Sequence, residues 1–359
     1  MDKLLITGAA GFIGSNFVHY WAKKYPQDDM VVLDLLTYAG NKNNLRNCLK
    51  LPNFKFVKGS ICDETLVDKI FTEYKINKVV HFAAESHVDR SITEPDAFIN
   101  TNILGTHTLL KVAKEFWLDG KLPDHLFHHV STDEVYGSLK LGDMAFKETN
   151  RYAPNSPYAS SKAASDHLVR AYHKTYDLNV TTSNCSNNYG PYQFPEKLIP
   201  LCLLNILSGK ALPIYGDGKQ IRDWLYVVDH CRGIDLVLKN GIHGETYNIG
   251  GNNERTNIDV VSFLCDVVNK KFSTSPDLAI RFPDSPCAYN KDAKSLITYV
   301  SDRPGHDVRY AVDTTKIDAQ LGYEPLTNFE QGLKLTVDWY LDNEDWWQSI
   351  LNNSYKLVE

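Results

Sequence analysis

The stretch TGAAGFIGS, Thr7 to Ser15, decides the fold of this chain. It follows the apolar run KLLIT and opens a segment of helical spacing, so Gly8, Gly11 and Gly14 fall at a strand-to-helix turn. Because glycine has no Cβ, such a turn can approach a pyrophosphate closely, and the amino end of the following helix then faces the phosphates. In this context the G-x-x-G-x-x-G spacing, rather than G-x-G-x-x-G, predicts a dinucleotide-binding turn.

Apolar runs like the one before this turn recur along the first half of the chain and alternate with segments of helical periodicity. The runs cover residues 3–7, 30–34, 54–57, 78–84, 125–132 and 179–186. They are continuous rather than alternating with polar residues, which indicates strands covered on both faces. We therefore predict an α/β fold, a Rossmann-type doubly wound parallel sheet with helices on either side. Residues 63–74 are predicted to form one of these helices, with Asp63 as its N-cap.

The strand-helix rhythm weakens after about residue 187, where segments rich in glycine, proline and aspartate intervene. Helical patterns return at 256–271 and 328–352. We expect residues 1–186 to form mainly the dinucleotide-binding domain. Residues 187–359 are expected to form mainly a smaller α/β lobe for the substrate, with some segments returning to the sheet.

The composition is that of an ordinary globular protein, with 43% hydrophobic and 23% charged residues. The net charge of −6 comes from interspersed acids and bases, which argues against nucleic acid or a membrane surface as a partner. The first residues lack a signal-peptide pattern and no apolar run reaches about 18 residues, so a cytoplasmic protein is expected. The seven cysteines form no C-x-x-C pair, so neither a disulfide nor a metal site is expected.

Two predicted helices, at 95–116 and 156–176, carry small and apolar residues on more than one face. Such helices are buried against something besides the sheet. A second subunit would make the protein a homodimer through these two helices. A helix pair buried within one subunit is the alternative.

Asp34 ends the second predicted strand, twenty positions after Gly14. A carboxylate at this place accepts hydrogen bonds from both ribose hydroxyls and repels a 2′-phosphate, so NAD is favoured over NADP. The alternative is that Asp34 only caps a loop.

The segment YASSK places Tyr158 and Lys162 four residues apart in a predicted helix, so both side chains emerge on one face. The ammonium and a nicotinamide cation would lower the tyrosine pKa, so that a phenolate accepts the proton of an alcohol as hydride leaves the carbon. A surface pair is the alternative. Ser131 and Thr132 end the strand at 125–132, where ligands bind in such folds, which favours the catalytic interpretation.

Longer motifs extend over almost the whole chain. They are TGAAGFIGSN, LDLLTYAG, HFAAESHVDRSI, STDEVYG, SPYASSKAASDHLV, NCSNNYGPYQFPEKLIP, IYGDGKQIRDWLYVVDH, YNIGG and DRPGHDVRYAVD. With them the chain resembles the extended short-chain dehydrogenase/reductase family, and within it the dTDP-glucose 4,6-dehydratases. Related sugar-nucleotide epimerases share the glycines, the tyrosine and the lysine but generally lack the acid pair after Ser-Thr. Asp133 and Glu134 are therefore the most discriminating residues.

The resemblance implies an NAD-dependent hydro-lyase that converts dTDP-glucose to dTDP-4-keto-6-deoxyglucose and water, in deoxysugar biosynthesis such as that of rhamnose. Oxidation at C4 acidifies the C5 hydrogen, and loss of the C6 hydroxyl then needs one base and one acid. Adjacent buried carboxyls raise one pKa, so Glu134 is expected as the base at C5 and Asp133 as the acid at O6. Thr132 would hydrogen-bond O4, Tyr158 would be the redox base and Lys162 would orient the nicotinamide ribose. A solvated turn is the alternative for the acid pair.

The resemblance also assigns contacts to cofactor and substrate. For NAD they are Gly8, Gly11, Phe12, Ile13, Gly14, Asp34, Thr37, Ser60, Ile61, Ala83, Ala84, Ser86, Tyr158, Lys162 and Asn188. For the nucleotide sugar they are Ser86, His87, Thr132, Asp133, Glu134, Asn187, Lys197, Leu198, Pro213, Tyr215, Arg222, Asn257, Arg303 and His306. The two arginines suit a diphosphate because a guanidinium binds its oxygens bidentately, with a surface salt bridge as the alternative for each.

Two details qualify these assignments. Ser60 replaces the acid that the family usually places near adenine, which leaves a hydroxyl for that contact. Residues 83–91 are expected to form a polar loop, in which His87 has a supporting role or is an ordinary satisfied polar residue. Three other functions stay open: the same chemistry on UDP-glucose, a nucleotide-sugar 4-epimerase, and an NAD-binding module without catalysis.

Overall fold

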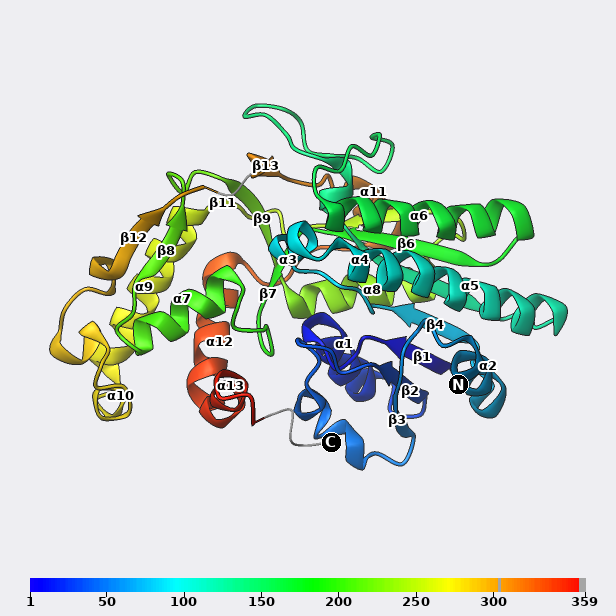
Figure 1. Ribbon diagram of the computed structural model, residues 1–359, viewed down its shortest axis with the longest axis horizontal. Helices are drawn as coiled ribbons and strands as arrows, with labels where there is room; N and C mark the ends of the chain where they lie inside the picture. The colour runs from blue at the N-terminus through cyan, green and yellow to red at the C-terminus, as the bar shows by residue number, and fades with distance from the viewer. Residues whose placement is uncertain (303–304, 355–359) are drawn as a thin grey trace.

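A seven-stranded parallel sheet forms the centre of the larger part of the molecule, in a computed structural model that describes residues 1–302 and 305–354 (Figure 1). Its strands follow the order β3-β2-β1-β4-β5-β6-β10. They are β1 Lys3–Thr7, β2 Asp29–Asp34, β3 Phe54–Lys58, β4 Lys78–His81, β5 Leu126–Thr132, β6 Val180–Cys185 and β10 Thr246–Ile249. The predicted Rossmann-type sheet is confirmed.

The order of the strands reverses beside β1. Leu5 pairs with Val31 of β2 on one side and with Val79 of β4 on the other, all in parallel register. After β3, at one edge of the sheet, the chain crosses to the other side of β1, where it forms β4. The strands β5 and β6 then extend the sheet away from β1. In such sheets the crevice beyond the carboxyl ends of the strands, at the reversal, is the place where ligands bind.

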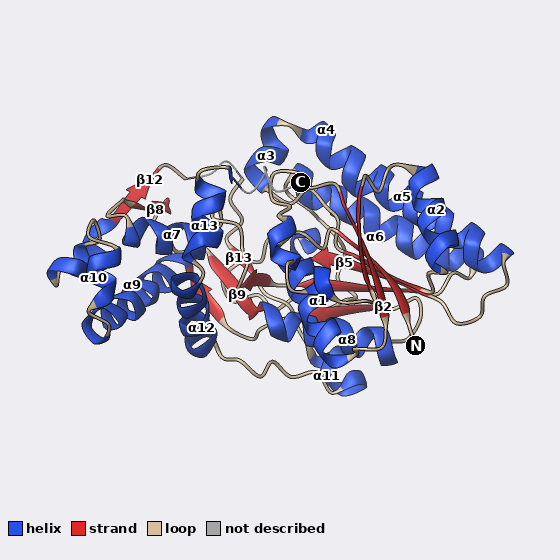
Figure 2. Ribbon diagram, turned by 90° about the horizontal axis from the view of Figure 1, so that it is seen from below, coloured by secondary structure: helices blue, strands red, loops and turns tan. Residues whose placement is uncertain are grey.

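Helices cover both faces of the sheet, as the continuous apolar strands predicted (Figure 2). One layer contains α1 Phe12–Lys24, α8 Val227–Asn240 and α11 Thr315–Leu321, and the other contains α2 Glu64–Tyr74, α5 Thr106–Lys114 and α6 Pro157–Tyr176. Asp63 is the N-cap of α2, as expected, because its carboxylate accepts the Leu66 N–H at 3.0 Å. α8 and β10 come from the second half of the chain, yet they pack with this sheet.

The smaller lobe has its own apolar core. Its helices are α7 Leu198–Leu207, α9 Asn257–Thr274, α10 Asp277–Arg281, α12 Phe329–Asp342 and α13 Glu344–Leu351. Its strands are β7 Asn187–Tyr189, β8 Leu212–Tyr215, β9 Ile221–Tyr226, β11 Glu254–Thr256, β12 Ile297–Val300 and β13 Arg309–Tyr310. The two parts join through polar contacts as well as packing, for example from the Trp346 indole N–H to Asn44 Oδ1 at 2.7 Å. The single helical pattern predicted at 328–352 is divided at Asn343.

The prediction of a polar loop over residues 83–91 is wrong in its second half. Val88–Thr93 form a short helix, α3, which His87 caps because its Nδ1 accepts the Arg90 N–H at 3.3 Å. A histidine is not a usual N-cap, so the helix start carried no recognisable signal.

The segment predicted as one helix at 95–116 is helical but not uniform. It begins as α4 Pro95–Phe98, widens to π-helical turns at Ile99–Gly105 and continues as α5. It packs on α6 within the subunit, where Asn102 Nδ2 donates to Ser161 Oγ at 2.8 Å. Part of the small-residue surface that suggested a dimer is therefore covered inside one chain.

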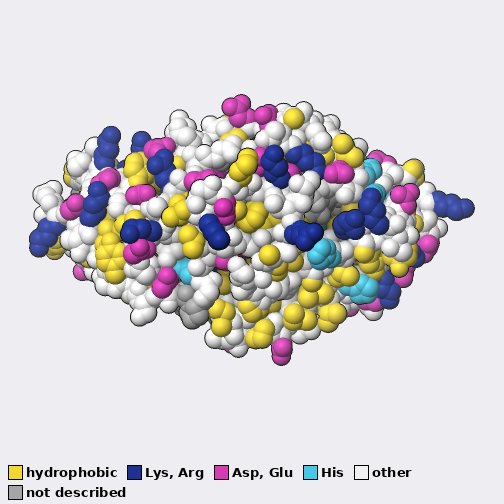
Figure 3. Space-filling model, turned by 90° about the horizontal axis from the view of Figure 1, so that it is seen from above, with side chains coloured by type: hydrophobic (Ala, Val, Ile, Leu, Met, Phe, Trp, Pro, Cys, Tyr) yellow, Lys and Arg dark blue, Asp and Glu magenta, His cyan; other side chains and the backbone are white. Residues whose placement is uncertain are grey.

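Three general properties of the described residues bear on function. None of their helices is long and apolar enough to cross a membrane. The seven cysteines are free thiols, and no cluster of metal-binding side chains is found in the described part of the chain. Acidic and basic side chains are interspersed on the face seen in Figure 3.

Candidate active site

A deep cleft opens beyond the carboxyl ends of the central strands, with a volume of about 330 Å³. That volume lies within the range typical of small-molecule sites. All residues predicted for the cofactor line it. Of those predicted for the substrate, Ser86, Thr132, Asp133, Glu134, Asn187 and Lys197 line it.

The glycine turn forms the floor of the cleft. Gly8 has a φ of +69°, and a Cβ there would lie 2.6 Å from Ala83 Cα. A Cβ on Gly14 would lie 2.7 Å from Gly8 O. Gly11 is the N-cap of α1 and has no side chain to cap the helix, so its first turn is open to an anion. This geometry fits the pyrophosphate of a dinucleotide.

Replacing Gly8 by alanine is expected to lower the free energy of unfolding by about 2–4 kcal/mol, because a positive φ and a backbone overlap both oppose a Cβ. Gly142→Ala is the matched control, since Gly142 has a φ of +89° but nothing within 4 Å of its Cβ position. That variant should lose only about 1 kcal/mol. Urea denaturation measures both. Equal losses would contradict the close approach of Gly8 to Ala83.

Asp34 both holds the turn and lines the cleft. Its two carboxylate oxygens accept the Ala10 N–H and the Leu36 N–H, each at 2.8 Å. Burial raises the pKa of Asp34, and these two hydrogen bonds oppose the rise. The side chain therefore caps the loop, as in the alternative considered above, and also faces the ligand space.

Tyr158 and Lys162 lie one turn apart at the start of α6, which Ser156 caps through the Ala159 N–H at 3.0 Å. Both line the cleft and both are buried. Burial and the charge of Glu134 raise the pKa of Tyr158 well above its usual range. The predicted lowering of this pKa needs Lys162 together with a nicotinamide cation. In the protein alone, removal of the phenol from water and the nearby carboxylates raise it instead.

The acid pair starts a short helical turn, Asp133–Tyr136, directly after β5. Thr132 caps it, with its Oγ1 accepting the Glu134 N–H at 3.3 Å. Asp133 is only 2% exposed, and its Oδ2 has no hydrogen-bond partner. Burial, and then the charge of Glu134, raise the pKa of Asp133 well above its usual range. Burial thus favours the neutral form of Asp133 beside the half-buried Glu134, and both residues line the cleft.

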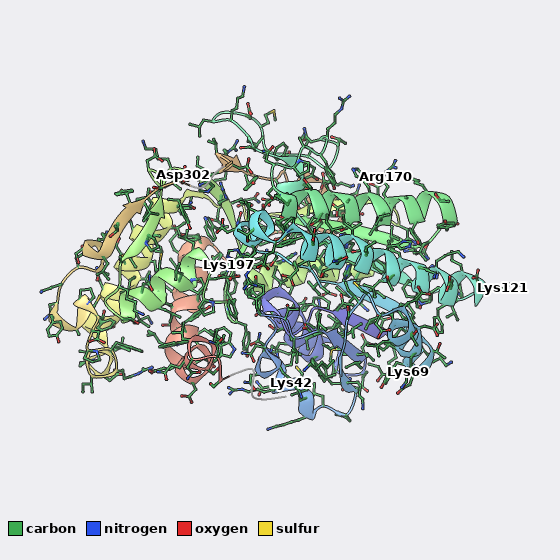
Figure 4. All side chains as sticks on the ribbon, viewed as in Figure 1. Lys42, Lys69, Lys121, Arg170, Lys197 and Asp302 are labelled. Carbon is green, nitrogen blue, oxygen red and sulfur yellow. The ribbon has the colours of Figure 1, made fainter. Side chains whose placement is uncertain are left out.

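The smaller lobe supplies the opposite wall. Lys197 lies between the two parts of the molecule (Figure 4), and its Nζ is 3.5 Å from the Ser86 carbonyl oxygen. Asn187 and Asn188 of β7 also reach the cleft, and Asn188 Oδ1 lies 3.0 Å from His230 Nδ1.

A second group of the predicted substrate residues lies in the smaller lobe outside the cleft lining. It contains Leu198, Pro213, Tyr215, Arg222, Asn257 and His306. His87 also lies outside the cleft lining, but it belongs to the larger part of the molecule, at the start of α3. The rings of Tyr215 and His306 are 6.3 Å apart, and the buried Arg222 guanidinium lies 4.5 Å from the Tyr310 ring centre. The positive charge of Arg222 acts on Asp133, so this group adjoins the acid pair. Arg303 lies outside the described residues.

Several residues of the cleft were not predicted. Tyr38, Phe194 and Glu196 line it, and Tyr38 donates to Glu196 Oε1 at 2.9 Å across the two parts. They come from loops without periodicity, and only their place inside the motifs LTYAG and YQFPEKLIP marked them. Ser60 does line the cleft, with its Oγ accepting the Cys62 N–H at 3.1 Å.

The fold, the glycine turn and the Tyr158–Lys162 pair define the class of protein: an extended short-chain dehydrogenase/reductase. Comparison with known proteins narrows this class. The family model described as GDP-mannose 4,6 dehydratase matches residues 5–336. A dTDP-glucose 4,6-dehydratase of Neisseria meningitidis serogroup B is 52% identical over 360 residues, covering 99% of this chain and 98% of the relative.

Solved structures agree. A dTDP-glucose 4,6-dehydratase from Bacillus anthracis str. Ames in complex with NAD is 45% identical, with a TM-score of 0.84, covering 98% of this chain and 100% of that one. Another, from Streptomyces venezuelae with NAD and dTDP bound, is 45% identical with a TM-score of 0.86, covering 97% and 99%. The chain belongs to the nucleotide-sugar 4,6-dehydratase family, within its dTDP-glucose 4,6-dehydratases.

Proposed function

We propose that the chain is a dTDP-glucose 4,6-dehydratase, which forms dTDP-4-keto-6-deoxyglucose and water. The observation that carries this proposal is the neutral Asp133 beside Glu134, in the same cleft as Tyr158 and Lys162. An elimination needs an acid and a base together with the oxidation machinery, and relatives about half identical over their full length carry this name.

NAD is the proposed cofactor, because the open first turn of α1 and the carboxylate of Asp34 fit its phosphates and ribose. When bound, NAD would supply the acceptor and later donor of the hydride, and a positive ring charge that would favour the Tyr158 phenolate. We propose Lys162 for the nicotinamide ribose and Asn188 for a further contact. Thr37, Ser60, Ile61, Ala83, Ala84 and Ser86 line the remaining cofactor space.

The chain's own groups move the protons. Tyr158, once a phenolate, accepts the O4 proton, and Thr132 hydrogen-bonds O4 as the carbonyl develops. Glu134 removes the acidified C5 proton, and the neutral Asp133 protonates O6 so that it leaves as water. A proton then returns to C5 from the Glu134 side. This order uses Asp133 in the neutral form that its burial favours, whereas the Tyr158 phenolate depends on the positive charge of the bound nicotinamide.

The remaining substrate residues are proposed to hold the sugar nucleotide. Asn187, Lys197 and Ser86, which line the cleft, are proposed for the sugar and diphosphate. His87, outside the lining, is proposed for a supporting contact. Arg222 and Arg303 are proposed for the diphosphate. We propose that the nucleoside is bound by Leu198, Pro213, Tyr215, Asn257 and His306.

Reaction in deuterated water tests the proposal. The product from dTDP-glucose is expected to lack one water, to carry solvent deuterium at C5 and to keep the original C4 hydrogen at C6. Mass spectrometry and proton NMR measure the three features, and no free NAD should be consumed. Stoichiometric NADH without water loss would reject the dehydratase.

The nucleotide base is tested by competition between dTDP-glucose and UDP-glucose at equal concentration. Preference for the dTDP sugar is expected from the family. Preference for UDP-glucose would mean that the same reaction takes place on the UDP sugar instead. A C4-inverted product would favour an epimerase, which the acid pair argues against. Absence of any conversion would favour a module that binds NAD without catalysis.

We also propose the wider features expected from the sequence: mainly NAD binding by residues 1–186, mainly substrate binding by residues 187–359, cytoplasmic location, and use in deoxysugar biosynthesis such as that of rhamnose. A homodimer through the α4–α5 segment and α6 is proposed as well. Ile92, Ile99 and Leu104 of the neighbouring surface are 46–51% exposed, which supports it. Light scattering should give twice the chain mass, and a monomer would reject this interface.

A further inference from the structure

A buried charge pair lies behind the catalytic helix. Lys162 and Asp166 stand four residues apart on α6, and they are 4% and 5% exposed. Lys162 Nζ donates to the Val130 carbonyl at 2.9 Å and lies 3.5 Å from His129 Nε2. The same nitrogen of His129 lies 3.1 Å from Asp166 Oδ1. The ammonium and the carboxylate therefore both lie beside one ring nitrogen of the buried His129.

Asp166 is surrounded by neutral donors. Its Oδ2 accepts the Ser131 hydroxyl at 2.9 Å, and the Tyr152 hydroxyl also donates to it. Burial, and then the charge of Lys162, hold the pKa of His129 well below its usual range, so the ring is neutral. A neutral ring with its proton on Nε2 donates to Asp166 and leaves Nδ1 as a buried acceptor without a partner. Burial raises the pKa of Asp166 to about 6, while the charge of Lys162 and the hydroxyl donors oppose the rise, so the carboxyl is mainly ionised at neutral pH.

Lys162 needs this carboxylate. Burial lowers its pKa to about 8, and the charge of Asp166 is the largest influence that opposes the fall. The other titratable groups that face the ammonium in the described structure are His81, His129 and Cys185. Burial keeps both histidines and the thiol neutral, so Asp166 is the one anion among them. A buried ammonium without an opposite charge gives up its proton or destabilises the fold.

We propose that Asp166 is the positioning residue of Lys162 and its buried counter-ion, with the neutral His129 ring beside both groups. The pairing itself is inferred from the distances to His129 and from the burial of both charged groups. Its consequence for catalysis rests on the proposed function: Asp166 keeps Lys162 protonated, and so able to favour the Tyr158 phenolate and hold the nicotinamide ribose.

A double-mutant cycle in urea tests the pairing without substrate or cofactor. The variants are Lys162→Met, Asp166→Asn and the two combined. Each single change leaves one buried charge uncompensated, so the combined variant is expected to unfold at a higher urea concentration than Asp166→Asn alone. If Asp166→Asn does not fold, folding of the combined variant supports the pairing. Additive losses, or a combined variant no more stable than Asp166→Asn, would overturn it.

The pH dependence of C4 oxidation tests the catalytic consequence. In the wild type the rate should fall as pH rises through about 8, the pKa of Lys162, because the neutral amine no longer favours the phenolate. In Asp166→Asn this alkaline fall should move down by about one pH unit or more. Stopped-flow absorbance of enzyme-bound NADH with dTDP-glucose measures it. A lower rate with an unmoved pH profile would mean a merely structural Asp166 and would overturn the proposal.

Two variants serve as controls for this titration. Asp235→Asn removes another buried carboxylate that pairs with a lysine, Lys24, far from the cleft, and should leave the pH profile unchanged. His129→Gln keeps a neutral donor toward Asp166. The pH at which its oxidation rate falls should lie within a few tenths of a pH unit of that of the wild type. If the wild type does not oxidise dTDP-glucose at all, the proposed function fails, and the urea cycle alone decides the pairing.

Discussion

Asp133→Asn combined with Glu134→Gln should leave C4 oxidation in place while water loss falls by about 10²–10⁴-fold or more, the usual contribution of acid-base groups. Amides of the same shape neither remove the C5 proton nor protonate O6. Tyr158, Lys162 and Thr132 are unchanged, so enzyme-bound NADH should still form. Absorbance of NADH measures the oxidation, and NMR of the sugar nucleotide measures water loss.

The matched control changes another adjacent acid pair, Glu344 and Asp345 at the start of α13, to the same amides. These residues lie outside the cleft lining, so turnover should stay close to that of the wild type. Unaffected turnover in the Asp133/Glu134 variant would remove both residues from the mechanism. Loss of oxidation together with elimination would instead mean that the pair shapes the site as a whole.

Tyr158→Phe should abolish both half-reactions, with turnover reduced by about 10²–10⁴-fold and no detectable NADH on adding dTDP-glucose. Without the phenolate no group accepts the O4 proton, so no ketone forms. The C5 hydrogen is then never acidified, and deuterium should not enter C5 from solvent. Stopped-flow absorbance and NMR in deuterated water measure the two losses.

Tyr172→Phe is the control on the same helix, because its hydroxyl lies 3.2 Å from His107 Nδ1 and does not line the cleft. It should keep wild-type activity and NADH formation. Enzyme-bound NADH should therefore be absent in Tyr158→Phe and present in the variant that combines Asp133→Asn with Glu134→Gln. NADH formation by Tyr158→Phe at the wild-type rate would contradict its role as redox base.

Much of the fold follows from short-range patterns in the sequence. Continuous apolar runs predicted the six first strands of the sheet, and the glycine spacing predicted the turn between β1 and α1. Helical periodicity placed Tyr158 and Lys162 on one face of α6, and Asp63 was recognisable as an N-cap. These features depend on residues within a few positions of one another, where steric and hydrogen-bonding rules act locally.

Other features were decided by contacts between distant segments. In the protein alone the pKa of Tyr158 is raised, because several elements bury the phenol and carboxylates lie nearby. The helix α3 starts at a histidine cap, and Tyr38 meets Glu196 across 158 positions of sequence. No periodicity signals such contacts.

By itself the sequence determined the parallel sheet, the dinucleotide turn and the proximity of the tyrosine and the lysine, because each needs only local spacing and apolar pattern. Only the tertiary structure decided how deeply each carboxyl is buried and which anion accompanies Lys162. Asp133 is adjacent to Glu134 in sequence but differs from it in burial, and Asp166 and Lys162 both lie beside a histidine on another element. The charge of a buried group depends on what surrounds it in space, and that is set by the folded chain.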